Sequence, residues 1–311
     1  MATLHNLDMR CPSLWNFCKA TRASLPVLLI ICAVSHTARS DWTVATAGAL
    51  SHDDNVSNAR TYNDKVSDFS ASATVSLSQS IPIGESYSLA AGGALSGQIY
   101  DSLTGLRNGS IDGLLSLKKK WGLGAFATWT RAGISLGRSD YQDGYRDATL
   151  YAASLELGKR IDERWNLWAK YAYERRAATP GAVEYLGVSS DAFSLRGRSF
   201  TANAEYTLSE RFSINLGSLL RHGDIVSTAQ TAAAGYYLSL NAKAVAPDPT
   251  FGPGAYAYRL DGTTYGARLG AEYSLTAHSL IGCGFQRVET HAQGGNNYTD
   301  SMPELTWNYR F

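Results

Sequence analysis

The sequence is poor in several features that mark other protein classes. Its 311 residues include four cysteines and eight prolines, and 28 basic residues face 27 acidic ones. The near-zero net charge excludes a strongly basic surface for nucleic acid, and a hydrophobic content of 44% excludes a disordered chain. Phosphate-loop, dinucleotide, zinc and haem motifs are missing, so we expect no cofactor and no metal site. Glycine and tyrosine, by contrast, are abundant, with 29 and 18 residues.

The N-terminal segment has the composition of a secretory leader. Residues 25–34 are uncharged and apolar, basic residues precede them, and Ala38-Arg39-Ser40 follows with small residues at the −3 and −1 positions. This pattern is typical of a signal peptide. We therefore predict that residues 1–40 are cleaved and that residues 41–311 form the exported protein.

Removal of the leader changes the cysteine count and the charge. Three of the four cysteines lie in it, and Cys283 alone remains, so the exported chain cannot form an internal disulfide. Four basic residues and one acidic residue also leave, which gives a formal charge of −2. Because the acidic Asp8 interrupts a long basic segment, translation from Met9 instead of Met1 is an alternative start.

Apolar and polar residues alternate with a period of two through the rest of the chain. Clear examples are residues 69–78, 200–208 and 263–275. Such alternation predicts β-strands with two chemically different faces. The apolar faces extend over about ten residues, which is the length of a strand that crosses a membrane at about 45°, whereas ordinary strands have about five or six residues. No later stretch has the roughly 18 consecutive apolar residues of a transmembrane helix.

The connections between these segments alternate in length. We expect twelve strands, near residues 41–52, 66–80, 87–100, 109–120, 123–137, 148–159, 166–178, 196–208, 212–226, 263–275, 279–291 and 299–311. Short links near 82–86, 121–122, 161–165, 209–211 and 276–278 take turns with long links at 53–65, 101–108, 138–147, 179–195, 227–262 and 292–298. Short periplasmic turns and long extracellular loops are typical of outer-membrane barrels. The predicted fold is all-β, a transmembrane antiparallel up-and-down barrel of twelve strands.

The C-terminus has aromatic residues at every second position, namely Trp307, Tyr309 and Phe311. This ending resembles the C-terminal signature of Gram-negative outer-membrane β-barrel proteins. The resemblance implies a place in the outer membrane, contact with its lipid and lipopolysaccharide, and reading of the last strand by the barrel-assembly machinery. The segment His52-Asp53-Asp54-Asn55-Val56 also resembles the opening of several barrels, including the barrel portion of surface lipoprotein assembly modifiers. The periplasmic repeat domain of those proteins is missing from this sequence, so we do not transfer their function.

Aromatic residues cluster at the ends of the expected strands, as in the girdles of membrane barrels. The periplasmic girdle is predicted to contain Trp42, Tyr87, Trp121, Trp165, Tyr206, Tyr273, Trp307 and Tyr309. The extracellular girdle is predicted to contain Tyr62, Tyr100, Tyr141, Tyr145 and Tyr151.

The polar faces of the strands should line the lumen and bring charged residues into it. Glu156, Glu205 and Glu272 each precede a short turn by four residues, so we expect them in one band near the periplasmic mouth. The basic residues expected in the lumen beside this band are Arg131, Lys170, Arg176, Arg221 and Arg268. Such a band can select charged or sugar-like solutes. Alternatively, the charges pair across the lumen and close it.

The connection 227–262 is long for a structureless loop. It can fold into the barrel as a constriction or extend the hairpin outside, and the second arrangement is the simpler expectation.

We therefore expect a narrow channel, or porin, for small polar or charged solutes. One alternative is a closed barrel that acts structurally, through adhesion or envelope organisation. Another is an outer-membrane lipid hydrolase, because His52, Asp53, Asp54, Asn55, His222, Asp224, Glu289 and His291 should lie at the outer edge. No serine stands at a convincing spacing from these residues for a hydrolytic triad, so we expect no enzyme.

Overall fold

A computed structural model describes residues 42–179 and 190–311. The predicted signal peptide lies outside these described residues. No helix in the described ranges is long and apolar enough to cross a membrane.

Thirteen β-strands in the described residues form one antiparallel sheet. Their bounds are β1 Trp42–Asp53, β2 Asp68–Ile83, β3 Tyr87–Tyr100, β4 Asn108–Trp121, β5 Thr128–Tyr141, β6 Ala148–Arg160, β7 Trp165–Ala178, β8 Leu195–Ser209, β9 Phe212–Ala229, β10 Ala244–Pro247, β11 Tyr256–Ser274, β12 Ser279–Ala292 and β13 Tyr298–Arg310. The helical segments are short: η1 Tyr62–Asp64, η2 Thr104–Leu106, η3 Ser190–Phe193, α3 Ala232–Ser239, η4 Pro249–Phe251 and η5 Gln293–Gly295.

The sheet closes on itself. Each strand from β1 to β8 pairs with the next, β9 pairs with β11, and β13 pairs back onto β1. The short β10 adds to the outer part of β11 only, so the barrel wall has twelve strands, as predicted. Closure leaves no free sheet edge, and every wall strand has a hydrogen-bonded neighbour on both sides.

The strand positions follow the alternating pattern closely, with two differences. The turn predicted at 121–122 is instead the loop 122–127, because β5 begins at Thr128. The strands β9 and β11 extend beyond the predicted ends, so the long connection covers 230–255. In both places the apolar alternation alone did not mark where pairing starts or stops.

The two faces of the wall differ in chemistry, as the alternation predicts. Phe69 is 63% exposed and Val75 is 52% exposed on the outer face of β2. On the inner face hydroxyl and amide groups bind one another across strands: Ser51 to Ser70 at 2.9 Å, Gln98 to Ser70 at 3.2 Å and Ser96 to Ser110 at 2.7 Å. An apolar exterior around a polar interior is the arrangement of a barrel that lies in lipid.

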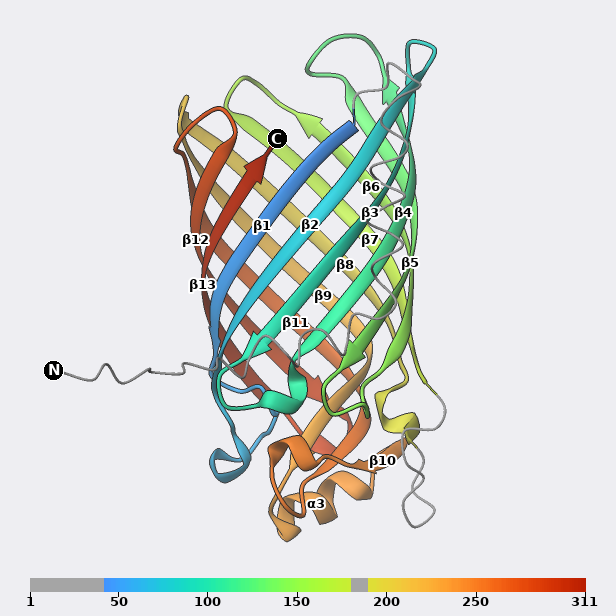
Figure 1. Cartoon of the computed structure of the whole chain (residues 1–311), viewed down its shortest axis with the longest axis vertical. Helices are drawn as coiled ribbons and strands as arrows, with labels where there is room; N and C mark the ends of the chain where they lie inside the picture. The colour runs from blue at the N-terminus through green and yellow to red at the C-terminus, as the bar shows by residue number, and fades with distance from the viewer. Residues whose placement is uncertain (1–41, 180–189) are drawn as a thin grey trace, which may run out of the picture. The chain divides into compact units, whose positions relative to one another are not determined.

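The two ends of the barrel are different (Figure 1). At one end, here called the turn end, lie the C-terminus and the links 84–86, 122–127, 161–164, 210–211 and 275–278. At the other, the loop end, lie α3, β10, η3 and the links 54–67, 101–107, 142–147, 230–255 and 293–297.

The aromatic prediction is correct at the turn end and partly wrong at the loop end. Trp121 and Trp307 are 58% and 45% exposed on the outer face, near the turns. Tyr100, however, packs against the buried Leu103 and Leu106, and Tyr145 packs against Phe193. Tyr141 lies under the guanidinium of Arg176, 5.0 Å from its ring centroid. These three tyrosines belong to the packed interior of the loop end and not to a lipid-facing girdle.

Gly223 permits a close approach of β8 to β9. Its φ of +147° is one that other residues rarely adopt, and a Cβ there would lie 2.3 Å from the carbonyl oxygen of Arg196. We expect Gly223→Ala to destabilise the barrel by about 1–3 kcal/mol, measured as a lower urea midpoint of the refolded protein. Gly97→Ala is the matched control, because its Cβ would meet Asn108 at 3.8 Å, an ordinary contact. Equal midpoints for the two variants would contradict this account.

Candidate functional site: the barrel interior

The inner surface toward the turn end is in contact with solvent. The side chains of Arg131, Lys170 and Arg268 are 40%, 43% and 49% exposed. All three project from the inner face of the wall, so their exposed area faces the lumen. Since packed side chains would cover these charges, this part of the lumen is a hydrated space.

A mostly basic cluster lies on the wall formed by β4 to β7. The Glu156 carboxylate forms ion pairs with Arg131 Nη1 at 3.2 Å and with Lys170 Nζ at 3.7 Å. The Trp129 ring lies beside two cations, with Lys118 Nζ at 4.6 Å and Arg131 Cζ at 5.2 Å from its centroid. Three positive charges and one carboxylate leave this wall net positive.

A mostly acidic cluster lies on β8, β11 and β13. Glu205 and Glu272 line one cavity of about 290 Å³ together with Arg268 and Trp168. Arg268 Nη2 donates to Glu304 Oε2 at 2.8 Å. Asn166, on β7, donates its amide to Glu205 Oε2 at 3.2 Å. Three carboxylates and one guanidinium make this side net negative, so the lumen has a basic wall and an acidic wall.

The structure therefore divides the predicted charge set. Glu205, Glu272 and Arg268 meet at one cavity, and Glu156, Arg131 and Lys170 form the separate basic cluster.

Two predicted members lie nearer the loop end. Arg176 donates to the hydroxyl of Tyr141 at 3.4 Å and to the carbonyl of Arg146. Arg221 donates to the carbonyl of Asp224 at 3.0 Å. Each of these side chains therefore holds a backbone carbonyl group near the loop end.

Two inward-facing tryptophans were missed by sequence reasoning. Gly158 is the cross-strand partner of both Trp129 and Trp168, and a Cβ at Gly158 would lie 2.2 Å from the Trp129 ring. The absence of a side chain at Gly158 thus lets the Trp129 indole lie against the wall. Trp129 lies two residues before Arg131 on β5, and Trp168 lies two residues before Lys170 on β7, so each pair faces the same side of the wall. The alternation in the sequence therefore already predicted that both tryptophans face the lumen.

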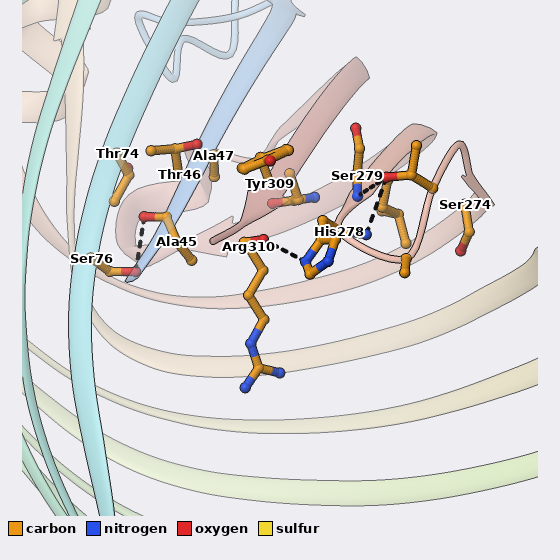
Figure 2. Close-up of a pocket in the computed structure, with 14 residues that line it drawn as sticks. Ala45, Thr46, Ala47, Thr74, Ser76, Ser274, His278, Ser279, Tyr309 and Arg310 are labelled. Carbon is orange, nitrogen blue, oxygen red and sulfur yellow. Dashed lines mark hydrogen bonds between the residues drawn. The ribbon is translucent and has the colours of Figure 1, made fainter. Parts of the chain in front are cut away.

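A second cavity, of about 350 Å³, lies at the turn end (Figure 2). His278 Nδ1 and the carbonyl oxygen of Arg310 are 3.0 Å apart, and Ser279 N–H donates to the Thr276 hydroxyl at 3.0 Å. The guanidinium of Arg310 extends away from this turn (Figure 2) and lies 3.3 Å from the hydroxyl of Thr43. A cation therefore stands where the last strand meets the first.

Toward the loop end the interior is packed instead of hydrated. Ile225, Tyr258 and Leu260 are buried on inner positions of β9 and β11, and Tyr298 is buried on β13. Leu238 of α3 packs on this cluster from the connection 230–255. We call this apolar cluster, together with the loops that cover it, the loop-end plug.

The loop 54–67 crosses the mouth to reach β9. Thr228 N–H donates to the carbonyl of Ser57 at 2.8 Å, and the Asn58 amide donates to the carbonyl of Val226 at 2.9 Å. Ser227 Oγ donates to the carbonyl of Asn58 at 2.7 Å. In the sheet order β11, β12 and β13 lie between β9 and β1. These bonds therefore join separated parts of the wall.

Asp64 anchors the same loop to the end of β9. Its carboxylate accepts the backbone N–H groups of Gln230 and Thr231 at 3.0 and 2.9 Å and the hydroxyl of Thr61 at 2.5 Å. Burial by itself would raise the pKa of Asp64, but the hydrogen bonds outweigh it and hold the pKa below its ordinary value.

The connection 230–255 also crosses the mouth, toward the loops after β3 and β5. The guanidinium of Arg146 forms salt bridges with Asp143 at 2.5 Å and with the fully buried Asp248 at 2.6 Å. Thr250 donates to the Asp143 carboxylate at 2.8 Å, and Phe251 packs with Leu103 and Leu106. Burial disfavours the charged form of Arg146, but the two carboxylates outweigh that effect and raise its pKa.

The long connection therefore combines the two arrangements that the sequence left open. It extends the β9–β11 hairpin and adds β10, as the simpler expectation had it. Its middle part then folds back across the mouth and closes on other loops. Because this contact depends on residues about a hundred positions away, the sequence of the connection alone could not show it.

In the described part of the chain, no serine hydroxyl is hydrogen-bonded to the histidines of the hydrolase alternative, so no serine–histidine pair is formed. His222 Nδ1 lies 3.0 Å from the Thr263 hydroxyl, and His291 Nε2 lies 3.0 Å from Glu289. Asp224 accepts Lys243 Nζ at 2.7 Å.

The fold is similar to solved outer-membrane barrels. The COG4313 outer membrane channel from Pseudomonas putida F1 aligns over 86% of this chain and 95% of its own, with a TM-score of 0.54 and 12% identity. The DcaP outer membrane channel of Acinetobacter baumannii also aligns, over 88% of this chain and 97% of its own, with a TM-score of 0.44 and 10% identity. The KdgM porin aligns over 86% of this chain and 99% of its own, with a TM-score of 0.40 and 10% identity. Of these three, only the first exceeds 0.5, and at 12% identity it supports a shared fold alone. No family model and no curated protein matches the sequence.

The Arg146 contacts predict how firmly the plug is held. Arg146→Ala would leave Asp248 as a buried charge without its cation, which costs about 3–5 kcal/mol. We expect faster hydrogen exchange and faster proteolysis in residues 244–257. Arg138→Ala is the control, because the pair of Arg138 with Asp140 is half-exposed and worth about 1 kcal/mol or less. Unchanged exchange in Arg146→Ala would show that Arg146 does not hold the connection.

The lowered pKa of Asp64 predicts acid sensitivity of the 54–67 contact. Its stabilising contribution is complete above the ordinary aspartate pKa and is lost as the pH falls through the lower folded value. We expect the amides of Gln230 and Thr231 to lose protection in that acid range, after correction for intrinsic exchange. Asp64→Asn should show weaker protection that no longer changes with pH. An acid response of equal size in this variant would assign the effect to another group.

Proposed function

We propose that the protein is an outer-membrane channel for small polar or charged solutes. The observation that carries this proposal is the half-exposed state of the lumen charges, since solvent must fill the space that they line. A basic and an acidic stretch of the wall produce a transverse field that aligns and discriminates solutes as they pass. The two indoles beside these charges add flat apolar surfaces, which suit solutes such as sugars that have both polar edges and an apolar face.

The orientation proposed for the barrel places the turn end in the periplasm and the loop end outside. The exposed Trp307 and Phe311 support the proposed contact with lipid and with the barrel-assembly machinery, because they form an outward aromatic row at the end of the last strand. Lipopolysaccharide is the proposed neighbour of the loop end. The secretory leader is part of the same proposal, since a chain must cross the inner membrane to reach this site.

The loop-end plug is the proposed gate of the channel. It covers the hydrated lumen with a buried apolar cluster and two loops held by carboxylate contacts. Passage then requires these loops to move, so the resting conductance should be small. A channel function also accounts for the interior charges without any catalytic group, and we infer that the protein is not an enzyme.

A closed structural or adhesive barrel is the second candidate, and the packed plug is the observation that favours it. In that case the loops act through their outer surface and the lumen charges only stabilise the wall. The two candidates differ in whether displacing the plug opens an ion pathway.

Conductance in planar bilayers tests the channel. We expect discrete steps whose size increases in Arg146→Ala, because loosening the plug opens the mouth. Glu205→Gln combined with Glu272→Gln should shift selectivity toward anions several-fold, because it removes negative charge from the acidic wall. Glu85→Gln, in the turn 84–86, is the control and should leave selectivity unchanged.

The same experiment separates the two candidates. Silence across a wide voltage range, in the wild type and in Arg146→Ala, would reject the channel and leave the closed barrel. Conductance steps whose ion selectivity is the same in the wild type and in the variant with Glu205→Gln and Glu272→Gln would show that solutes do not pass these two residues.

A further inference from the structure

We propose that the loop end contains a calcium site formed by Asp53, Asp54 and Asp300. Asp53 ends β1, Asp54 begins the loop 54–67, and Asp300 lies on β13, the strand next to β1. One carboxylate oxygen from each residue lies within 4.8 Å of the others. Calcium binds oxygen at about 2.3–2.6 Å, so two ligands on opposite sides of the ion are about 5 Å apart. The observed spacing fits a single ion between the three oxygens.

The burial of Asp300 is a separate observation that points to a cation. Asp300 is 6% exposed, and its Oδ1 is buried without a hydrogen-bond partner in the described residues. No lysine or arginine of the described residues lies within ion-pair distance of the three carboxylates. A buried carboxylate beside two others is costly in its ionised form unless a positive charge compensates it, and without such a charge it favours the protonated form. A divalent cation at the point where the three meet removes that cost.

Hydrogen bonds from the backbone orient two of the carboxylates. Asp53 accepts the backbone N–H of Asn55 at 2.8 Å, and Asp54 accepts the backbone N–H of Ser301 at 2.8 Å. These bonds fix two of the carboxylates before an ion arrives. Carboxylate oxygens suit calcium, which accepts flexible coordination geometry, whereas magnesium prefers a near-ideal octahedron and retains most of its water.

The position of the site gives the ion a structural effect. Asp54 belongs to the loop that crosses the mouth, and Ser57 and Asn58 of that loop bind β9. Asn55 also lies against β13, with its amide 3.4 Å from the carbonyl of Thr299. Calcium would therefore fasten the start of the loop to β13 and hold the plug closed. The binding itself does not depend on the channel function.

Terbium luminescence tests the site in the full exported barrel, refolded in detergent without lipopolysaccharide. Tyr298 is buried two residues from Asp300, and excitation of a nearby tyrosine sensitises bound terbium. We expect saturable terbium emission that calcium displaces. Binding should be at least about tenfold weaker in Asp300→Asn and in Asp54→Asn, because each loses a charged ligand, and the loss of an outer-shell partner alone weakens metal binding by about 10–100-fold. Asp101→Asn, an exposed aspartate of the loop 101–107, is the control and should bind as the wild type does.

Two outcomes would overturn the site. One is emission that is not saturable or that calcium does not displace; the other is equal affinity in the wild type and in Asp54→Asn. Because Asp54 is exposed, this second variant keeps the proposal testable if Asp300→Asn fails to refold. As a second readout, calcium should slow hydrogen exchange of residues 54–60 in the wild type and not in Asp54→Asn. A silent bilayer with intact terbium binding would reject the channel and retain the calcium site.

Discussion

The backbone of a membrane-spanning strand must find all its hydrogen-bond partners within the protein, because lipid supplies none. In this protein the pairing of β13 with β1 and of β9 with β11 meets that requirement by closing the sheet. Closure then dictates the rest of the architecture. Alternate side chains must face lipid or the lumen, and twelve strands enclose an interior too wide for wall side chains alone to fill.

The interior is filled differently at the two ends of the barrel. Toward the turns, charged side chains remain hydrated and segregate into a basic wall around Trp129 and an acidic wall around Glu205 and Glu272. Toward the loops, inner positions become apolar, and two loops cover them through buried carboxylates. Asp64 accepts backbone donors and Asp248 binds Arg146. Such contacts are specific and break when one partner is removed, which suits a closed state that can open.

The site was only partly predictable from the sequence. Strand parity placed Arg131, Lys170 and Arg268 in the lumen and would have placed Trp129 and Trp168 there too. Parity could not show that Glu156 joins the basic cluster while Glu205 and Glu272 share a cavity, because that depends on register between strands. Tyr100, Tyr141 and Tyr145 were assigned to a lipid-facing girdle, but they lie near the loop end, where loops cover the inner face and the rings pack inside.

The sequence by itself determined the class of fold, the number of strands and the two faces of each strand. It could do so because alternation and connection length are local properties that every strand repeats. Only the tertiary structure decided where the lumen is open and where it is packed. The plug joins residues 57 and 228, 64 and 230, and 146 and 248, and Asp300 meets Asp53 only because the barrel closes. Contacts between such distant residues have no period along the chain, so no local pattern predicts them.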